Sequence, residues 1–281
     1  MSHADALFAI GKTHTVCEDY ARAGLVHPEE DEVRSHRPYA IVSDGCSSSE
    51  DTDFGSRLLT ASAVHSLNMF DTLKAEWAIW RALDRVMKPL HPNCLDATLL
   101  TAHEDKSGVV QVFVAGDGVV VAKPRKGGLL VWVIDYQGAP GYLTYLMDRT
   151  RFDLWINEGL GKRTVTTLNE KGEVVETEEH QFKVQDDEEG IQNFGWTIDF
   201  DPGDFELVML LSDGAQSFVD DKLNLVPLTD VIPHLLDIRM PKGKFLARSH
   251  RFFLAKTCPK LGWQNNDDFG AAAIMLDNPE E

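Results

Sequence analysis

Two apolar segments of this chain end in the same tripeptide, Ser-Asp-Gly, and their aspartates are the first candidates for chemistry. Asp44 follows the segment 39–43 and Asp213 follows the segment 207–212, so both carboxylates are expected at the ends of buried strands. A carboxylate held rigidly at a sheet edge is well placed to bind a hard cation. Two acidic pairs lie beside similar apolar runs: Glu18-Asp19 and Asp267-Asp268. We expect these residues to form one multi-carboxylate metal site.

The chemistry of such a site follows from its ligands. Clustered carboxylates repel one another, and a bound divalent cation or protonation of one member relieves the repulsion. Ligands that are all oxygen atoms favour magnesium or manganese over zinc. Two such ions roughly 3.5–4 Å apart would bridge a water, lower its pKa toward neutrality and hold a phosphoryl oxygen, as phosphoester hydrolysis requires. The chain has no HExxH, GxSxG or Walker motif, so the common nucleophilic and nucleotide-binding alternatives lack support.

A third Asp-Gly, at Asp117, has a different setting. Asp-Gly is the commonest short signal of a β-hairpin, and residues 110–121 read as a strand, a turn and a strand. From local sequence we therefore interpret Asp117 as part of a hairpin turn. Asp44 leads instead into a polar loop, and Asp213 leads into a short helical turn.

Short apolar or alternating runs predict the strands that would position these acids. They lie at about 5–11, 38–43, 96–103, 109–115, 119–123, 129–135, 205–212 and 269–276. Apolar residues at helical spacing predict helices at about 53–68, 71–88 and 242–257, the second with Asp71 as its cap. Regular alternation of strand and helix is absent, which argues against a doubly wound parallel sheet. The predicted class is α+β, with mostly antiparallel sheets covered by helices.

We expect the whole chain, 1–281, to form a single domain. A more polar stretch at about 148–204 is interpreted as a surface projection. Within it, 164–168 and 174–177 alternate as an exposed two-stranded ribbon, and an acidic loop follows at 186–190. Such a projection either gates a site or decorates the fold.

The charge balance excludes some classes of partner. The 45 Asp and Glu residues outnumber the 27 Lys and Arg residues, giving a formal charge of −18, which repels a phosphate backbone or an anionic membrane. The four cysteines include no CxxC pair, the first residues lack the features of a signal peptide, and no stretch approaches ~18 uncharged apolar residues. We expect a cytoplasmic protein that binds neither nucleic acid nor membranes.

The ordered set of motifs resembles that of the metal-dependent protein serine/threonine phosphatases of the type 2C class, in their bacterial-like branch. The matching segments are Cys17–Asp19, Val42–Gly45, Asp96–Thr98, Ala115–Gly118, Leu211–Gly214 and Asn266–Phe269. Each is weak alone, but six in the family's order are fairly specific. The resemblance covers residues 5–276 and implies a four-layer α-β-β-α sandwich, with two sheets between helix pairs and a dinuclear magnesium or manganese centre at one end.

The resemblance also implies a role for each acidic residue. Asp44 would bridge both ions, with the carbonyl of Gly45 beside it. Asp213 and Asp267 would complete the ligand shell of one ion. Asp117 matches the family's third-metal aspartate, so two or three ions are implied. The pair that would act on the other ion, partly through bound water, is Glu18-Asp19.

The chain departs from the family pattern at three places. The family commonly has an arginine four residues before the first glutamate, where it grips the substrate phosphate, and this chain has His14. Histidine offers fewer donors and a conditional charge, so a weaker or pH-dependent phosphate contact is expected, for which Lys12 could compensate. Cys46 stands where animal members often have a general-acid histidine, although bacterial relatives also lack it. Gly118-Val119 replaces a Ser-Arg pair.

The resemblance implies an enzyme that hydrolyses phosphoserine or phosphothreonine in a phosphorylated protein, by attack of a metal-activated water, with a cognate kinase as a further partner. Two alternatives stay open. One is a phosphatase of small phosphorylated metabolites. The other is a weak or inactive pseudophosphatase that keeps the fold and binds partners through residues 148–204. Retention of the main acids favours an enzyme, whereas His14 keeps the pseudophosphatase alternative open.

Overall fold

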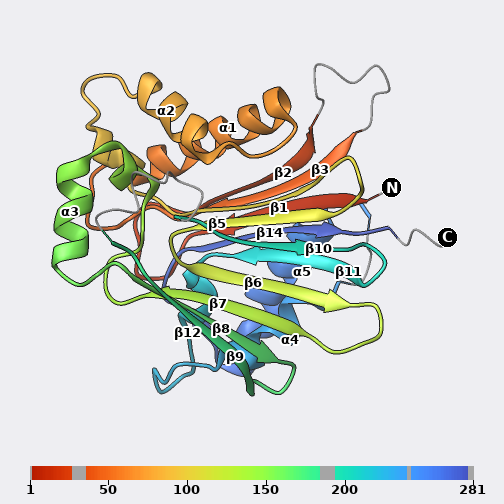
Figure 1. Ribbon diagram of the computed structural model, residues 1–281. Coiled ribbons are helices and arrows are strands. Elements are labelled where there is room, and N and C mark those ends of the chain that lie inside the picture. The colour runs from red at the N-terminus through yellow and green to blue at the C-terminus, as the bar shows by residue number, and fades with distance from the viewer. Residues whose placement is uncertain (1, 27–35, 184–193, 239–241, 278–281) are drawn as a thin grey trace.

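Two stacked antiparallel sheets form the centre of the molecule (Figure 1). The computed structural model describes residues 2–26, 36–183, 194–238 and 242–277. Within these residues the larger sheet has seven strands, in the order β1 (His3–Ala9), β14 (Phe269–Met275), β11 (Phe205–Leu211), β6 (Gly118–Pro124), β7 (Leu130–Tyr136), β8 (Lys162–Asn169) and β9 (Val174–Gln181). The smaller sheet has the order β10 (Trp196–Phe200), β5 (Val110–Ala115), β4 (Leu99–Glu104), β3 (Arg37–Ser43) and β2 (Tyr20–Val26).

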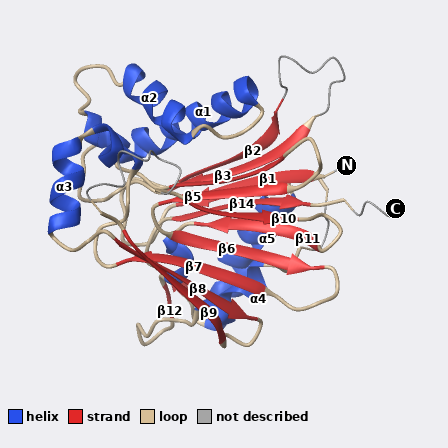
Figure 2. Cartoon of the chain, in the orientation of Figure 1, coloured by secondary structure: helices blue, strands red, loops and turns tan. Residues whose placement is uncertain are grey.

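Helices cover the outer faces of the two sheets (Figure 2). On the five-stranded side lie α1 (Thr52–Phe70) and α2 (Ala75–Arg85). On the seven-stranded side lie α4 (Leu228–Leu235), α5 (Phe245–Phe252) and α6 (Cys258–Leu261). A further helix, α3 (Arg149–Asn157), stands at one end of the sheets. The predicted α+β class and its four-layer sandwich of antiparallel sheets are confirmed.

The central strands are buried on both faces, which explains their continuous apolar sequences. In β11, Val208 and Leu210 belong to the core that includes the space between the sheets. Leu207, Met209 and Leu211 belong to the second core, between the seven-stranded sheet and its helices. Because side chains alternate along a strand, one apolar segment contributes to both cores. The strand ends that carry Asp44 and Asp213 are therefore fixed from two sides.

Two strands of the central sheets, β2 and β10, lie outside the predicted strands, and β2 carries an interior glycine. Gly24 pairs in register with Tyr39 of β3, and a Cβ at position 24 would approach the Tyr39 hydroxyl to 2.8 Å. The tyrosine ring fills the space that a side chain would occupy. A glycine that weakens a strand in isolation thus fits the sheet through its neighbour.

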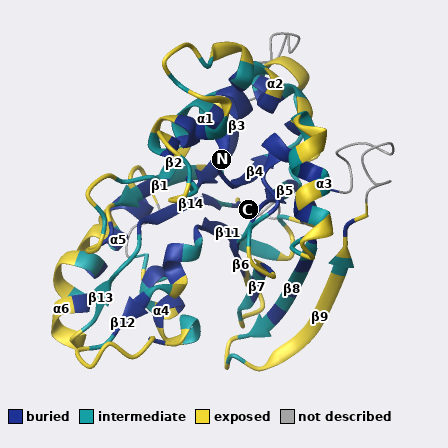
Figure 3. Cartoon of the chain, turned by 90° about the vertical axis from the view of Figure 1, so that its left-hand side faces the viewer, coloured by how far each residue is buried: buried dark blue, intermediate teal, exposed yellow. Residues whose placement is uncertain are grey.

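The segment 148–204 is built into the fold more fully than a separate projection would be. The predicted hairpin is confirmed as β8 and β9, but β8 also pairs along the whole of β7. The hairpin thus extends the seven-stranded sheet, with β9 as its exposed edge (Figure 3). The segment also supplies α3 and β10, and β10 pairs with β5. The acidic loop at 186–190 lies outside the described residues.

The predicted helix at 71–88 begins later, at Ala75, and Asp71 does not cap it. Asp71 instead ends α1: it has a left-handed backbone (φ 61°), and its N–H donates to the Leu67 carbonyl. Its carboxylate pairs with the buried Arg37. The predicted helix at 242–257 is also divided, because α5 passes through a π-helical turn into α6.

None of the helices in the described part of the chain is long and apolar enough to cross a lipid bilayer.

Candidate active site

One pocket gathers almost all of the predicted site residues. It has a volume of about 270 Å³ and lies at one end of the stacked sheets. The predicted residues that line it are His14, Glu18, Asp44, Gly45, Asp117, Asp213 and Asp267. The other lining residues are Cys46, Ser47, Gly138, Pro140, Tyr142 and Asp268, of which Asp268 belongs to the predicted acidic pair without an individual role in that prediction. Asp19, the remaining predicted residue, is 1% exposed and lies behind the pocket wall.

The antiparallel topology explains why residues so distant in sequence meet. Asp44 directly follows the end of β3, and Asp213 follows β11 after one residue. Asp19 directly precedes β2, and Asp268 directly precedes β14. In an antiparallel sheet the end of one strand lies beside the start of its neighbour. Acids that follow some strands and precede others therefore reach the same edge.

The two Ser-Asp-Gly serines have different partners. The Ser43 hydroxyl donates to the Thr98 carbonyl at 2.6 Å. The Ser212 hydroxyl donates to Oδ2 of Asp19 at 2.6 Å and accepts from the Gly270 N–H at 2.9 Å. Ser212 therefore fixes the buried Asp19 carboxyl beneath the pocket.

The second Ser-Asp-Gly motif, at residues 212–214, packs closely against the start of β14 because it ends in a glycine. A Cβ at Gly214 would lie 1.6 Å from the Asp268 carbonyl oxygen. Any other residue would push the turn after Asp213 away from the start of β14, because two non-bonded heavy atoms cannot approach so closely. Gly214 thus sets the distance between two of the acidic segments.

The acids are held close enough to raise one another's pKa. Burial, with the nearby Asp213 and Asp268 carboxylates, raises the pKa of Asp19 to about 7, although hydrogen bonds from Asp44 and Ser212 oppose the shift. Burial, with the nearby Asp19 and Asp213 carboxylates, raises the pKa of Asp44 well above its ordinary value. The Asp213 pKa is also raised, chiefly by burial, although a hydrogen bond with Asp44 lowers it. A cation among these carboxyls would stabilise their ionised forms.

Asp117 is not part of a hairpin, so that interpretation is wrong. β5 belongs to the five-stranded sheet and β6 to the seven-stranded sheet, and the chain crosses between them at Gly116 and Asp117. Burial, followed by the charge of Asp213, raises the pKa of Asp117 to about 7. A strand-turn-strand sequence does not distinguish a hairpin from a crossing between stacked sheets. The crossing places Asp117 at the pocket.

Glu18 is positioned by α1 and by Asp268, the second residue of the predicted acidic pair, for which no individual role was expected. The Thr52 hydroxyl, in the first turn of α1, donates to Glu18 Oε1 at 2.8 Å. The Glu18 N–H donates to Asp268 Oδ2 at 2.6 Å, and the Gly11 N–H donates to Asp268 Oδ1 at 2.8 Å. Asp268 is thus a buried anchor for the segments before β2 and after β1. Its neighbour Asp267 is 43% exposed, and the pair Asp267-Asp268 was the available signal.

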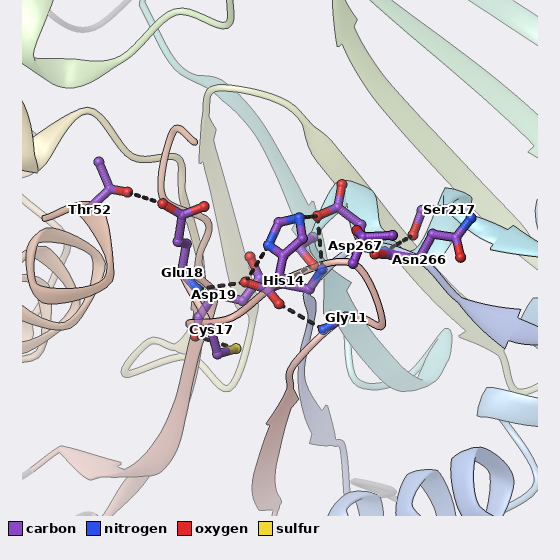
Figure 4. A network of polar contacts seen from close by, with 12 residues as sticks. Gly11, His14, Cys17, Glu18, Asp19, Thr52, Ser217, Asn266 and Asp267 are labelled. Atoms are coloured by element: carbon purple, nitrogen blue, oxygen red, sulfur yellow. Dashed lines mark hydrogen bonds and ion pairs between the residues drawn. The ribbon is translucent and has the colours of Figure 1, made fainter. Parts of the chain in front are cut away.

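His14 lies against the acids at the pocket edge (Figure 4). Its Nε2 is 3.1 Å from Asp267 Oδ1, and its Nδ1 is 3.2 Å from Asp268 Oδ2. Ligand atoms of His14, Glu18 and Asp268 all lie within 4.8 Å of one another, a spacing that could hold a metal ion. Lys12 hydrogen-bonds to Gln264 and does not line the pocket.

The chain matches a known family over most of its length. Residues 12–242 match the family model described as protein phosphatase 2C. The chain belongs to the protein phosphatase 2C family. No match was found among curated proteins.

Solved structures show that the phosphatase 2C fold extends over the whole chain. A bacterial serine phosphatase is 10% identical, with a TM-score of 0.51 and coverage of 99% of this chain and 98% of the other. The RsbU and RsbW domains of Rv1364c from Mycobacterium tuberculosis are 12% identical (TM-score 0.51), with coverage of 99% of this chain and 62% of the other. A C. elegans sex determining protein is 15% identical (TM-score 0.50), with coverage of 99% and 65%. This phosphatase 2C chain therefore spans somewhat less than two thirds of the last two structures.

Proposed function

We propose that the protein is a metal-dependent phosphatase that hydrolyses phosphoserine or phosphothreonine in proteins. The observation that carries the proposal is the charge of the pocket. Six carboxylate residues line it, and the described lining includes neither lysine nor arginine. A phosphate dianion would be repelled from such a pocket, because like charges at close range cost several kcal/mol in a partly dry site, on the order of the Coulomb energy at intermediate dielectric. Bound cations would reverse the sign of the site.

The donor set fits hard divalent cations. Its ligand atoms are carboxylate oxygens, with the Gly45 carbonyl beside them, which suits magnesium or manganese. Asp44 hydrogen-bonds to both Asp19 and Asp213, the central position expected of a residue that bridges two ions. When bound, such ions would lower the pKa of a water and polarise a phosphoryl oxygen.

The remaining acids would form two groups of ligands, one for each ion beside Asp44. Asp213 and Asp267 would hold one ion, and Glu18 with Asp19 would hold the other. Asp117, beside Asp213 in charge contact, would serve a third ion. The proposed partners are a phosphorylated protein substrate and a kinase that phosphorylates it.

His14 is proposed to face the substrate phosphate from the edge of this group. Its two nitrogens contact Asp267 and Asp268, so the ring is already engaged by carboxylates. This contact favours weak phosphate binding by the protein itself. It is also the observation that favours a pseudophosphatase as the second candidate function.

Hydrolysis of an aryl phosphate with manganese tests the proposal. The wild-type protein should turn over the substrate with manganese and lose turnover with excess chelator. Asp213→Asn should lower kcat by roughly a hundredfold or more, since removal of a group acting on the transition state costs several kcal/mol. Asp84→Asn, an exposed change of the same charge on α2, is the matched control. Metal binding without turnover would instead establish the pseudophosphatase.

A second comparison separates protein from metabolite substrates. A phosphoserine peptide, a phosphothreonine peptide and a panel of phosphorylated metabolites would be compared by kcat/KM at one manganese concentration. Preference for the peptides is expected. Preference for a metabolite would refute the protein substrate while leaving the metal-dependent chemistry intact.

A further inference from the structure

Asp96 belongs to the Asp-Ala-Thr motif, has no role in the centre proposed above and is 2% exposed. Its carboxylate accepts hydrogen bonds from Thr144 Oγ1 at 2.6 Å and Ser49 Oγ at 3.0 Å. Arg151 donates from Nη1 to Oδ1 at 3.0 Å and from Nη2 to Oδ2 at 2.7 Å. The Asp96 backbone carbonyl accepts from the Cys46 N–H at 2.8 Å. Asp96 thus joins four segments of the chain.

Two of these segments are walls of the pocket. On one side, Cys46 lies two residues after Asp44 and lines the pocket. On the other side, Tyr142 lines the pocket and immediately precedes the 3-10 helix Leu143–Met147, which carries Thr144. Ser49, from the segment after Cys46, and Thr144 both donate to the buried Asp96 carboxyl, while Cys46 itself is bonded to the Asp96 backbone carbonyl. The width of the pocket between these walls therefore depends on where that carboxyl is held.

Asp44 itself is tied to the same motif. The Asp44 N–H donates to Thr98 Oγ1 at 2.9 Å, and the Thr98 N–H donates to the Asp44 carbonyl at 2.8 Å. A displacement of the motif would move Asp44 together with the wall that follows it.

Arg151 is the residue that fixes the Asp96 carboxylate in one orientation. It comes from α3, which lies at the end of the sheets where β6 begins (Figure 1). Its guanidinium makes two parallel bonds to the two carboxylate oxygens, a geometry that a lysine cannot reproduce. The group also lies 4.9 Å over the Tyr145 ring and donates to Asn93 Oδ1 at 3.1 Å.

We infer that Arg151 is a positioning residue: through Asp96 it sets the placement of Asp44 and of both pocket walls, and it couples α3 to the site. The kinetic part of this inference rests on the proposed function. A buried ion pair can also be purely structural, since such pairs are often replaceable without loss of fold. A positioning role and a purely structural role predict different results when the Arg151–Asp96 pair is broken in a protein that still folds. Only the positioning role predicts a change in the mobility of the pocket wall and in kcat/KM.

The test compares Arg151→Met, Arg151→Lys and Thr144→Val with the wild type. Arg149→Met is the control, because Arg149 is on the same helix, is exposed and pairs with Asp153 at 2.8 Å. Two quantities are measured well below the unfolding temperature. One is amide hydrogen exchange of residues 44–52, without substrate. The other is kcat/KM for an aryl phosphate with manganese, and melting temperatures are recorded for all variants.

For Arg151→Met we expect faster exchange at residues 44–52 and a kcat/KM lowered roughly tenfold to a hundredfold, the scale of an ångström-sized misplacement of reacting groups. Arg151→Lys should recover part of the loss. Thr144→Val, which removes one bond to Asp96, should give a smaller change of the same sign and decides the question if Arg151→Met does not fold. Arg149→Met should match the wild type.

A lowered melting temperature with wild-type exchange and wild-type kcat/KM in both folded variants would overturn the inference, because it would show a purely structural pair. If the wild type has no phosphatase activity, the proposed function fails, yet the exchange measurement still decides the positioning role. Unchanged exchange at residues 44–52 would then refute it.

Discussion

Replacing Asp44 by asparagine should stabilise the protein in the absence of metal while abolishing its response to metal. Asp44 hydrogen-bonds to Asp19 and Asp213, and all three carboxyls have raised pKa values, chiefly because they are buried. A protonated Asp44 has one O–H to donate, and an asparagine of the same shape has an NH2 group that can donate to these neighbours. It cannot ionise. The variant therefore keeps the packing and removes one of three charges.

The magnitude follows from Asp19. Its pKa rises from 3.8 to about 7 in the folded protein, and one pKa unit corresponds to about 1.4 kcal/mol, so ionised Asp19 costs the folded state up to about 4 kcal/mol. Asp44 carries a cost of the same kind, because its own burial and the charges of Asp19 and Asp213 raise its pKa. Removing its ionisable carboxyl should recover about 2 kcal/mol at pH 8. For a chain of this size that corresponds to a rise of roughly 5 °C in melting temperature.

The sign with pH is fixed by linkage. The pKa of Asp19 is higher in the folded protein than in the unfolded chain, so the folded protein binds more protons between about pH 4 and pH 7. The stability of the folded state therefore falls as pH rises through that range. Because the pKa of Asp44 is raised well above its ordinary value, lowering the pH to 5 shifts Asp44 toward its protonated form, which resembles asparagine. The wild type and Asp44→Asn should then unfold at nearly the same temperature, and they should diverge at pH 8.

Calorimetric unfolding in chelator at pH 5 and pH 8 measures this difference, with Asp84→Asn, on the exposed face of α2, as the control for net charge. Added manganese should raise the melting temperature of the wild type and leave that of Asp44→Asn nearly unchanged. An Asp44→Asn protein that is less stable than the wild type at pH 8 in chelator would refute the reasoning. So would a stabilisation of equal size at both pH values.

Further predictions concern metal binding and the pocket edge. Manganese affinity measured by calorimetry should fall steeply from pH 8 to pH 6, because Asp19 and Asp117, each with a pKa raised to about 7, must lose protons on binding; a flat profile would contradict this. Gly214→Ala should weaken manganese binding at least tenfold and lower stability by about 2 kcal/mol, since its Cβ would overlap the Asp268 carbonyl; wild-type affinity would show that the turn tolerates the shift. His14→Arg should lower KM for a phosphopeptide several-fold if residue 14 faces phosphate, and an unchanged KM would place it outside the substrate site.

Most of the candidate site could be predicted because its residues carry local signals. An acid directly after or before a buried strand is visible in the sequence, as at Asp44 and Asp213. Asp117 shows the limit of such signals: the same local pattern fits a hairpin and a crossing between sheets. Only the pairing of β6 with β11 and β7 decides between them.

Other features depend on contacts that no local pattern encodes. In the strand β2, Gly24 is covered by the Tyr39 ring of the neighbouring strand. Asp268 accepts backbone N–H groups from Gly11 and Glu18, more than 240 positions away along the chain. The role inferred for Asp96 requires Arg151, whose helix lies in a stretch interpreted as a projection. Long-range partners of buried polar groups are set by topology, so the sequence indicates that such groups need partners without naming them.

The charge of the pocket also limits how substrates can be distinguished. With neither lysine nor arginine among its described lining residues, the pocket would, under the proposed function, bind phosphate mainly through cations, and cations attract every phosphoester alike. Selectivity must then come from the walls, where Ser47, Pro140 and Tyr142 are the groups that a peptide or metabolite would meet beside its phosphate. These walls are the parts of the pocket joined through Asp96. A change that moves them should therefore alter the ratio of kcat/KM values between substrates, whereas a change in the acids should lower all of them together.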